Sequence, residues 1–399
     1  MSVEPEEYCE LIAGSAPQRT GMVVGTDEAI GRTAAEDVIA DVALPAFATS
    51  AMDGYALDAQ ALTRARAGVR ISVTGDVPAG GATVDILPGT AVRVMTGAQV
   101  PNAAEAVVPV EFTDASRTGA APDHLVVTGL PDRLRSGWNI RHVGEDTQVG
   151  DTVITAGETI TAAGIGTLAM LGRTEISVQR PLTVGIIVTG DELRTDATAS
   201  AKAGSGPFIH NSNLPMLASA LRQAGAVPLE RGCGDDPNHL LQILDDLAGQ
   251  VDLIITTGGI SAGAFEVVRQ ALEGRHSTFL RLGLRPGGPQ GYGRCGNVPM
   301  LHFPGTPTGA FLSFHLFAVS LLTGQTLDTR WKKAVFAGPA VAGHRKGVSL
   351  APGRFTAHGE VEIAPRSRLR DFAGADVIIR VPGAPDALED GDVISVLDC

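Results

Sequence analysis

The sequence predicts a multi-domain protein of the α/β plus β class, with a doubly wound α/β domain in its third quarter. Three observations support this prediction. The chain has 399 residues, which is too long for one ordinary hydrophobic core. From Leu182 onward, short apolar runs alternate with helical patterns. Between Ile71 and Val127, short β-like runs alternate instead with glycine and proline turns, which indicates a separate β module.

The α/β domain is the clearest part of the pattern. An apolar run at 183–188 is typical of a buried parallel strand. It is followed in order by a helix at 213–225, a strand at 226–231, a helix at 237–248, a strand at 251–257 and a helix at 265–273. Gly225 closes the first helix, and Pro237 stands in the first turn of the second. This order implies right-handed crossovers, with ligands at the carboxyl ends of the strands.

The flanking regions follow weaker signals. Residues 27–40 have helical spacing that ends before Pro45, and the stretches 144–154 and 156–160 resemble the two arms of a hairpin. An alanine-rich helix should run to about Leu171. The apolar stretch 311–322 is interrupted by Ser313 and His315, and we expect it to be a buried helix because it is too short to span a membrane. After Leu327 short strands and turns predict a small β domain.

Charge and cysteine content narrow the class of function. The formal net charge is −13, which disfavours binding to nucleic acid but not to a small anion in a local pocket. The four cysteines form no C-x-x-C pair, so they predict separate reduced thiols rather than a zinc site or disulfides. The acidic beginning does not resemble a signal peptide. We therefore expect a cytoplasmic protein with no direct membrane insertion.

Two strand ends in the α/β domain carry candidate chemistry. The first, 186–193, ends in Thr-Gly-Asp-Glu-Leu, and the second, 254–263, ends in paired glycines followed by Ser261. Glycines let backbone N–H groups approach an anion closely, and a following helix N-terminus favours negative charge. Each could be an ordinary βα turn, but two in one sheet favour a site for a phosphate-bearing ligand.

Other polar segments are less specific when taken singly. Arg281 and Arg285 flank a proline and glycine turn and could hold an oxyanion, whereas 303–309 reads as a helix cap. Asp53, Asp146 and Asp235 are each typical of a turn or cap. If the fold brings carboxylates to the arginines, Mg²⁺ could bridge them to a phosphate. A nucleotide-dependent dehydrogenase is disfavoured, because no G-x-G-x-x-G follows the first strand of the α/β domain.

The order of the motifs carries the interpretation further. The chain reads P-A-F-A-T-S-A-M-D-G-Y-A, R-V-M-T-G-A, N-I-R-H-V-G-E-D, V-T-G-D-E-L, T-G-G-I-S-A-G, R-P-G-G-P and P-G-T-P. Together with S-R-L-R-D-F-A-G-A-D-V-I-I near the end, this series resembles the MoeA family of molybdopterin molybdenumtransferases, which includes the E domain of gephyrin. The resemblance runs from about residue 27 to the end.

The resemblance implies an elongated homodimer of four-domain subunits. It assigns 1–43 and 142–179 to a discontinuous linking domain, 44–141 to an inserted β domain, 180–327 to a molybdopterin-binding α/β domain and 328–399 to a C-terminal β barrel. The family reaction inserts molybdate into adenylylated molybdopterin and releases AMP with the help of Mg²⁺. The active cleft forms between the α/β domain of one subunit and the inserted domain of the other.

The resemblance also implies the site residues. The catalytic candidates are Asp53, Thr96, Asp146, Glu192, Asp235 and Glu266, of which Glu192 and Asp235 would hold the metal. The candidates for substrate binding are Gly190, Asp191, Ser212, Asn213, Gly258, Gly259, Ser261, Arg281, Arg285, Pro304, Thr306, Pro307 and Ser367. Asp53 and Thr96 would reach across from the partner subunit.

The chain departs from the usual family pattern at several positions. Ala48 and Thr49 replace an acid and an amide, and Arg285 and Gly288 replace lysines. Glu266 stands for an aspartate, and Thr306 for an asparagine. A second hypothesis therefore stays open, in which a gephyrin-like dimeric scaffold binds a linear peptide of a membrane receptor or of a cytoskeletal division protein such as FtsZ. Trp138 and Trp331 are expected to pack, and His210, His302 and His315 to be structural or solvated, because they lack metal-ligand spacing.

Overall fold

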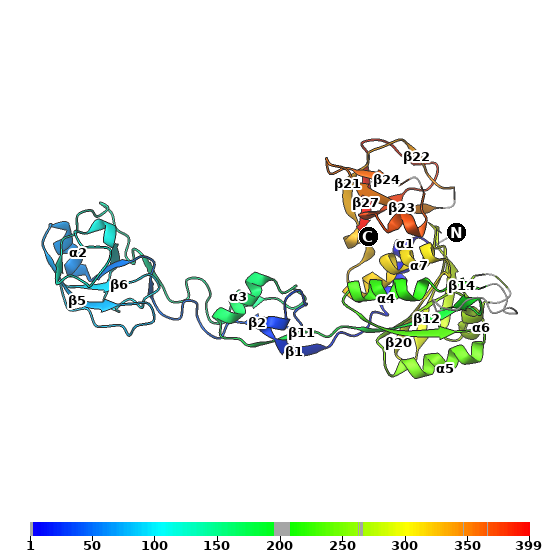
Figure 1. The fold of residues 1–399 in the computed structure, drawn as a ribbon, viewed down its shortest axis with the longest axis horizontal. Coiled ribbons are helices and arrows are strands. Elements are labelled where there is room, and N and C mark those ends of the chain that lie inside the picture. The colour runs from blue at the N-terminus through cyan, green and yellow to red at the C-terminus, as the bar shows by residue number, and fades with distance from the viewer. Residues whose placement is uncertain (1–2, 195–207, 262, 264–265, 346, 365) are drawn as a thin grey trace. The chain divides into compact units, whose positions relative to one another are not determined.

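The chain folds into two compact units, Met1–Arg19 with Arg180–Cys399 and, between them, Thr20–Gln179 (Figure 1). A computed structural model describes residues 3–194, 208–261, 263, 266–345, 347–364 and 366–399. Each unit has its own sheets and hydrophobic cores. The division into four domains stays a prediction.

A six-stranded sheet organises the first unit, in the order β15-β12-β16-β20-β19-β17. The first four strands are parallel, and the last two join antiparallel. The strands are β12 (Thr183–Thr189), β15 (Val227–Cys233), β16 (Leu253–Thr257), β17 (Ser277–Arg281), β19 (Pro289–Cys295) and β20 (Val298–Phe303). The predicted strands of the α/β domain are therefore confirmed, and the sheet gains an antiparallel edge that the sequence did not indicate.

Helices cover both faces of this sheet, as expected for a doubly wound domain. Leucines of α4 (Asn213–Gln223) share a core with Ile186 and Ile255, whereas those of α5 (Pro237–Ala248) share another with Ile187 and Ile254. Since neighbouring residues of a strand point to opposite faces, α4 and α5 lie on opposite sides. The short helix α6 (Val267–Leu272) packs with α5, and the predicted start of that helix at Phe265 lies outside the described residues.

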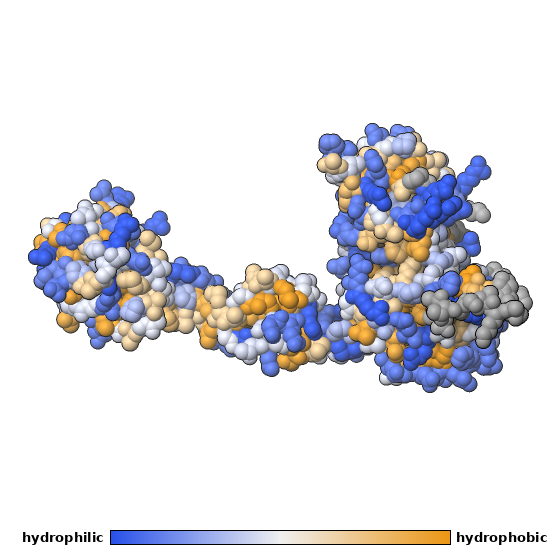
Figure 2. Space-filling model, viewed as in Figure 1, coloured by the Kyte–Doolittle hydropathy of each residue, from blue (hydrophilic) through white to orange (hydrophobic). Residues whose placement is uncertain are grey.

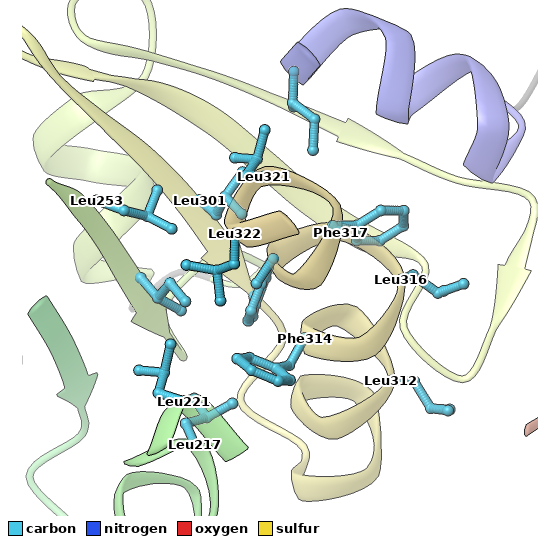
Figure 3. Packing of buried hydrophobic residues seen from close by; sticks show 14 of the residues in the cluster. Leu217, Leu221, Leu253, Leu301, Leu312, Phe314, Leu316, Phe317, Leu321 and Leu322 are labelled. Atoms are coloured by element: carbon cyan, nitrogen blue, oxygen red, sulfur yellow. The ribbon is translucent and has the colours of Figure 1, made fainter. Parts of the chain in front are cut away.

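The apolar stretch 311–322 is a buried helix, as predicted. It belongs to a continuous helical segment made of α7 (Pro307–Ser313), the π-helical turn η3 (Phe314–Ala318) and α8 (Val319–Thr323). Figure 3 shows Phe314 and Leu322 of this segment facing Leu217 and Leu221 of α4. The N-terminal helix α1 (Pro5–Ala13) buries Tyr8 in the same core.

The C-terminal strands continue this unit. Their sheet runs β18-β23-β25-β27-β21, with β24 paired to β23, and β22 pairs separately with β26. A bridge from Phe336, just after β21, to Val361 of β24 brings the two ends of this sheet together. The expected β barrel nevertheless stays a prediction. The elements are β18 (Leu284–Arg285), α9 (Leu327–Arg330), β21 (Lys332–Val335), β22 (Val341–Ala342), β23 (Val348–Phe355), β24 (Val361–Ile363), α10 (Leu369–Phe372), β25 (Val377–Val381), β26 (Ala387–Leu388) and β27 (Val393–Asp398). The short strands β13 (Leu193–Arg194) and β14 (Ile209–His210) form a separate pair outside both six-stranded sheets.

The second unit contains a five-stranded sheet in the order β7-β4-β6-β5-β8. It confirms the predicted β module, but the sequence reading missed α2 (Ala59–Arg66), whose N-cap Asp58 accepts a hydrogen bond from the Ala61 N–H. The strands are β4 (Gly54–Leu57), β5 (Ile71–Val77), β6 (Ala91–Val94), β7 (Ala106–Pro109) and β8 (His124–Leu125), with the 3₁₀ turn η2 (Val110–Phe112).

The remainder of this unit is built on three small pairings. The strands β1 (Gly21–Gly25) and β11 (Glu175–Gln179) pair, as do β2 (Val38–Ile39) with β10 (Thr152–Ile154) and β3 (Thr49–Ser50) with β9 (Ile140–Arg141). The alanine-rich helix is confirmed as α3 (Ala162–Met170). Figure 2 shows hydrophobic surface over α3 and the β1–β11 pair, where Val23 and Met170 are exposed.

Two predictions in this region are wrong. Residues 27–40 are not a helix beyond the 3₁₀ turn η1 (Thr26–Glu28), because Gly31 adopts a φ of +74° and Ala34 donates its N–H to the Glu158 carbonyl. The stretches 144–154 and 156–160 do not pair with each other, because both pair with the segment at 33–39 instead. Within the described part of the chain, no helix combines the length and apolarity needed to cross a membrane.

Candidate functional site

A cleft of about 390 Å³ opens in the first unit where β12, β16 and β20 end. Since these strands are parallel neighbours, their carboxyl ends and the loops after them meet at one edge of the sheet. Eleven predicted site residues line the cleft, namely Gly190, Glu192, Ser212, Asn213, Asp235, Gly258, Gly259, Ser261, Glu266, Thr306 and Pro307. Asp191 and Pro304 adjoin it through hydrogen bonds to Asp235 and Thr257.

Glycines let the strand ends approach one another closely. Gly258 has a φ of +94°, and a Cβ there would lie 2.8 Å from the Thr189 hydroxyl oxygen and 3.0 Å from the Thr189 carbonyl oxygen. Gly305 stands so near that its Cβ would lie 3.2 Å from the Gly258 Cα. The cleft is therefore lined by backbone at points where a side chain would not fit, as the sequence motif predicts.

Carboxylates gather on one side of the cleft. The N–H of Asp191 donates to Asp235 Oδ2 at 3.4 Å, and the N–H of Asp235 donates to Asp191 Oδ1 at 3.3 Å. Burial raises the pKa of Asp235, and the negative charges of Asp191, Glu192 and Glu266 raise it further, against the lowering effect of the Asp191 N–H. The like charges around Asp235 favour a proton or a cation at this side of the cleft.

Glu266 has a structural role in the loop after β16. Its Oε2 accepts the Ser261 N–H at 2.8 Å, and its Oε1 accepts the Gly263 N–H at 3.3 Å. The carboxylate therefore holds the loop that follows the paired glycines.

The residues of the cleft fit a magnesium ion that takes some of its ligands from the protein and others from a substrate phosphate and water. The described residues contain no preformed group of three or more metal-ligating His, Cys, Asp or Glu side chains. Mg²⁺ does not require such a group, because it keeps several waters and binds one or two carboxylates together with substrate phosphates. Glu192 and Asp235 both line the cleft, and the negative charges of Glu192 and Glu266 add to the effect of burial in raising the pKa of Asp235.

Three predicted residues of this unit neither line nor adjoin the cleft. Arg285 donates from Nη1 to His344 Nε2 at 2.8 Å, and Arg281 ends the edge strand β17, opposite Pro289. Ser367 borders a separate hollow of about 680 Å³ in the C-terminal sheet. Because β17 runs parallel to β20 with β19 between them, Arg281 lies at the same edge of the sheet as the cleft, two strands away from β20.

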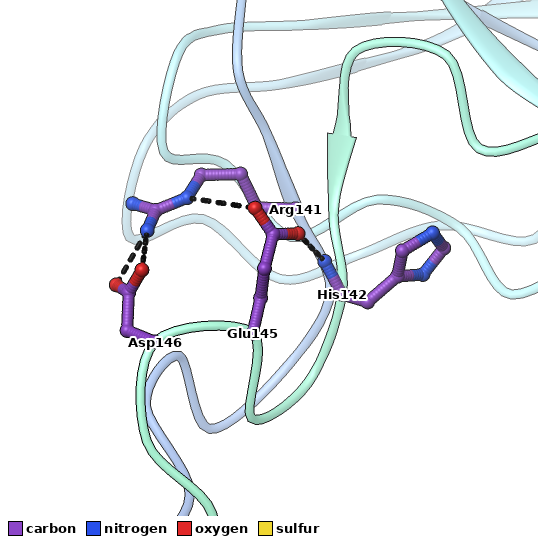
Figure 4. A network of polar contacts seen from close by, with 4 residues as sticks. All are labelled: Arg141, His142, Glu145 and Asp146. Atoms are coloured by element: carbon purple, nitrogen blue, oxygen red, sulfur yellow. Dashed lines mark hydrogen bonds and ion pairs between the residues drawn. The ribbon is translucent and has the colours of Figure 1, made fainter.

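The remaining predicted residues belong to the second unit. Thr96 donates from both its N–H and its hydroxyl to Asp53 Oδ1 at 2.7 Å, and these bonds lower the pKa of Asp53, the backbone bond most. The two residues, 43 positions apart, thus form one pair. Figure 4 shows Asp146 bonded to Arg141, whose Nε also lies 3.9 Å from Glu145 Oε1.

Nine further described residues line the cleft without having been predicted from the sequence, among them Thr189 and Thr257. These two threonines end β12 and β16, and both are buried. Thr257 donates its hydroxyl to the Pro304 carbonyl at 2.9 Å, and so links the ends of β16 and β20. A threonine inside an apolar strand is ordinary β sequence, so the pattern offered no signal for this link.

Comparison with known sequences identifies the family. The family model described as the MoeA N-terminal region (domain I and II) matches residues 3–172, and that of a probable molybdopterin binding domain matches 185–324. Molybdopterin molybdenumtransferase 2 of Mycobacterium tuberculosis is 38% identical over 323 residues, covering 78% of this chain and 77% of the relative. This chain belongs to the MoeA family. The molybdopterin molybdenumtransferase of Bacillus subtilis is 31% identical over 94% of this chain and 89% of its own.

Solved structures agree on the fold. A MoeA protein of molybdopterin biosynthesis from Pyrococcus horikoshii superposes with a TM-score of 0.82 at 23% identity, covering 100% of this chain and 99% of its own. A molybdenum cofactor biosynthesis protein from Pyrococcus furiosus gives a TM-score of 0.59 at 14% identity, with both chains covered completely. The resemblance expected from the motifs is confirmed as membership of the MoeA family with a MoeA-like fold.

Proposed function

We propose that this MoeA protein acts in molybdenum cofactor biosynthesis as a molybdopterin molybdenumtransferase. In this reaction molybdate is inserted into adenylylated molybdopterin, and AMP is released. The observation that carries the proposal is the glycine-lined cleft with carboxylates on one side. Relatives that cover most of the chain carry the name of this enzyme.

The loops after β12 and β16 would bind the phosphate of the substrate. The Gly258 N–H donates to the Phe303 carbonyl at 3.2 Å, but Gly258 and Gly259 have no side chains to obstruct an oxyanion, and Ser261 adds a hydroxyl donor at the same edge. Glu192 and Asp235 would hold Mg²⁺, which neutralises phosphate charge and stabilises the leaving group. Glu266 would keep the Ser261 loop in place through its two backbone hydrogen bonds.

The pair Asp53 and Thr96 would complete the site from a second copy of the chain in a homodimer. Thr96 holds the Asp53 carboxylate in one orientation and keeps it ionised, as a group that must bind a cation or accept a proton would need. Exposed apolar residues such as Val23 and Met170 supply surface for association between copies.

Molybdenum insertion into purified adenylylated molybdopterin tests the proposal. The wild-type protein should release AMP and form the molybdenum cofactor in the presence of Mg²⁺, and chelation should stop the reaction. Glu192→Ala and Asp53→Ala should each lower the rate by at least about tenfold. Asp246→Ala, an exposed residue of α5 outside the cleft, serves as the control and should keep the wild-type rate. A wild-type rate no higher than that of Glu192→Ala would refute the transferase.

The alternative function is a gephyrin-like scaffold with eroded activity. A hollow of about 180 Å³ between α1, α8 and α9 favours it, because apolar Ile12 and Leu327 line this hollow beside the carboxylates of Glu6 and Asp328. A linear peptide of a membrane receptor or of a division protein such as FtsZ could lie there. A labelled peptide from the FtsZ C-terminus should then bind the wild type but not Ala13→Trp, which fills the hollow. Equal binding to both would exclude this location.

A further inference from the structure

The carboxamide of Asn213 ties two of the glycine-tipped strand ends together. Asn213 is the first residue of α4, lines the cleft, and is 6% exposed. Its Nδ2 donates to the Thr257 hydroxyl oxygen at 2.9 Å and to the Gly305 carbonyl at 2.8 Å. One side chain therefore joins the end of β16 to the loop after β20.

These bonds fix which way the carboxamide points. The Gly305 carbonyl can only accept, so it must face the amide nitrogen. Thr257 gives its own hydroxyl hydrogen to the Pro304 carbonyl, so it too must accept from Asn213. Both amide hydrogens are thereby used, and a flipped carboxamide would lose both bonds.

The other end of the carboxamide is left without a partner. Asn213 Oδ1 is buried and accepts no hydrogen bond in the described part of the chain. A buried carbonyl oxygen without a donor is costly, and native proteins rarely keep one without a reason. Because Asn213 lines the cleft, a bound molecule can supply the missing donor.

We propose that Asn213 Oδ1 accepts a hydrogen bond from an N–H or O–H group of the organic part of the substrate. This inference rests on the proposed function, since adenylylated molybdopterin carries such donors in both its pterin and its nucleoside. Molybdate and the diphosphate ester of adenylylated molybdopterin carry no donor at neutral pH and would be repelled by a carbonyl oxygen. Asn213 thus binds the organic part of the substrate, while the neighbouring glycines leave room for its phosphate.

Calorimetric titration of Asn213→Leu with three separate probes tests this role. AMP represents the nucleotide half of the substrate, molybdopterin represents the pterin half, and molybdate, which carries no donor at neutral pH, represents the oxyanion. The half that carries the donor should bind about tenfold more weakly to Asn213→Leu than to the wild type. Molybdate should bind both proteins equally. Asn213→Ala, which also lacks an acceptor in its side chain, gives the same comparison if the leucine variant does not fold.

Gln290→Leu is the matched control. Gln290 is also a buried carboxamide, 1% exposed, whose Nε2 donates two hydrogen bonds and whose Oε1 accepts none in the described part of the chain. It does not line the cleft, so its replacement should lower stability without weakening AMP or molybdopterin binding.

Three results would overturn the inference. The first is unchanged binding of both AMP and molybdopterin to Asn213→Leu. The second is an equal loss in Thr257→Val, which breaks the link between the loops but keeps the carboxamide. The third is an equal loss for molybdate. A wild-type protein that binds neither AMP nor molybdopterin would instead refute the proposed function itself.

Discussion

Asp235 is the residue at which the electrostatics of the cleft can be tested directly. Its pKa is raised, so in the folded protein the ionised carboxylate is less favourable than in the unfolded chain. The resulting loss of stability is present above the raised pKa. It disappears below the ordinary value of 3.8, where the group is protonated in both states.

Asp235→Asn should therefore stabilise the ligand-free protein at pH 7.5. We expect the midpoint of thermal unfolding to rise by about 1–2 °C, and this gain to vanish near pH 3.5. Thermal melts of the wild type and the variant at both pH values measure it, with Asp246→Asn as the control on exposed surface. A gain that is the same at both pH values would contradict a cause in the ionised carboxylate.

The sequence predicts much of the site at the scale of residues, and for a physical reason. Glu192, Asp235 and Gly258 follow three strands of one parallel sheet, so the topology alone brings them together. The link through Thr257 could not be predicted, because it depends on which side chains meet once the strands are in register. Arg281 ends β17, which runs parallel to β20 with β19 between them, so it lies at this same edge of the sheet but does not line the cleft.

At the scale of elements, the turn from β16 into α6 depends on close backbone packing. Gly258→Ala should lower the free energy of unfolding by about 2–4 kcal/mol, because it adds a contact with Thr189 to the strain of a positive φ. Gly274→Ala is the matched variant, with a φ of +73° but no neighbour within 4 Å, and should cost only about 1 kcal/mol. Urea unfolding measures both. Equal costs would mean that the close approach adds nothing to the strain.

Elements with a strong local sequence pattern were easier to predict than segments whose structure depends on partners far away in the sequence. The βα units from Thr183 to Leu272 have strong local periodicity, and the structure confirms them. Residues 27–40 have helical spacing too, but several backbone N–H groups of this segment, including those of Gly31 and Ala34, donate to residues more than a hundred positions away. The local sequence pattern carries no information about such a distant partner, so tertiary pairing overrides the helical preference there.

At the scale of the whole molecule, each hydrophobic core described below contains residues of only one of the two units. The largest core joins residues of α1 to the α/β sheet and to the C-terminal strands, all in the first unit. The cores of residues 20–179 contain residues of that unit alone in the described part of the chain. We therefore expect the two units to unfold separately, although the chain passes from one to the other twice.

Tyr8→Ala tests this separation, because Tyr8 lies at the start of the chain but packs in the core of residues 180–399. It is 0% exposed, its hydroxyl donates to the Gly291 carbonyl at 2.9 Å, and its ring meets Phe317 edge-on at 4.7 Å. The substitution should destabilise the first unit by about 3–5 kcal/mol. Amide hydrogen exchange should accordingly become faster in peptides of residues 180–399 and stay unchanged in those of 20–179.

Leu11→Ala on the same helix is the control, since Leu11 is 47% exposed and its loss should change stability by less than about 0.5 kcal/mol. Faster exchange in residues 20–179 of Tyr8→Ala would show that the two units unfold together. If the faster amide exchange is confined to residues 180–399, the N-terminal helix unfolds together with the α/β unit. The cleft and its supporting core would then be built from both ends of the sequence, with the segment between them folding on its own cores.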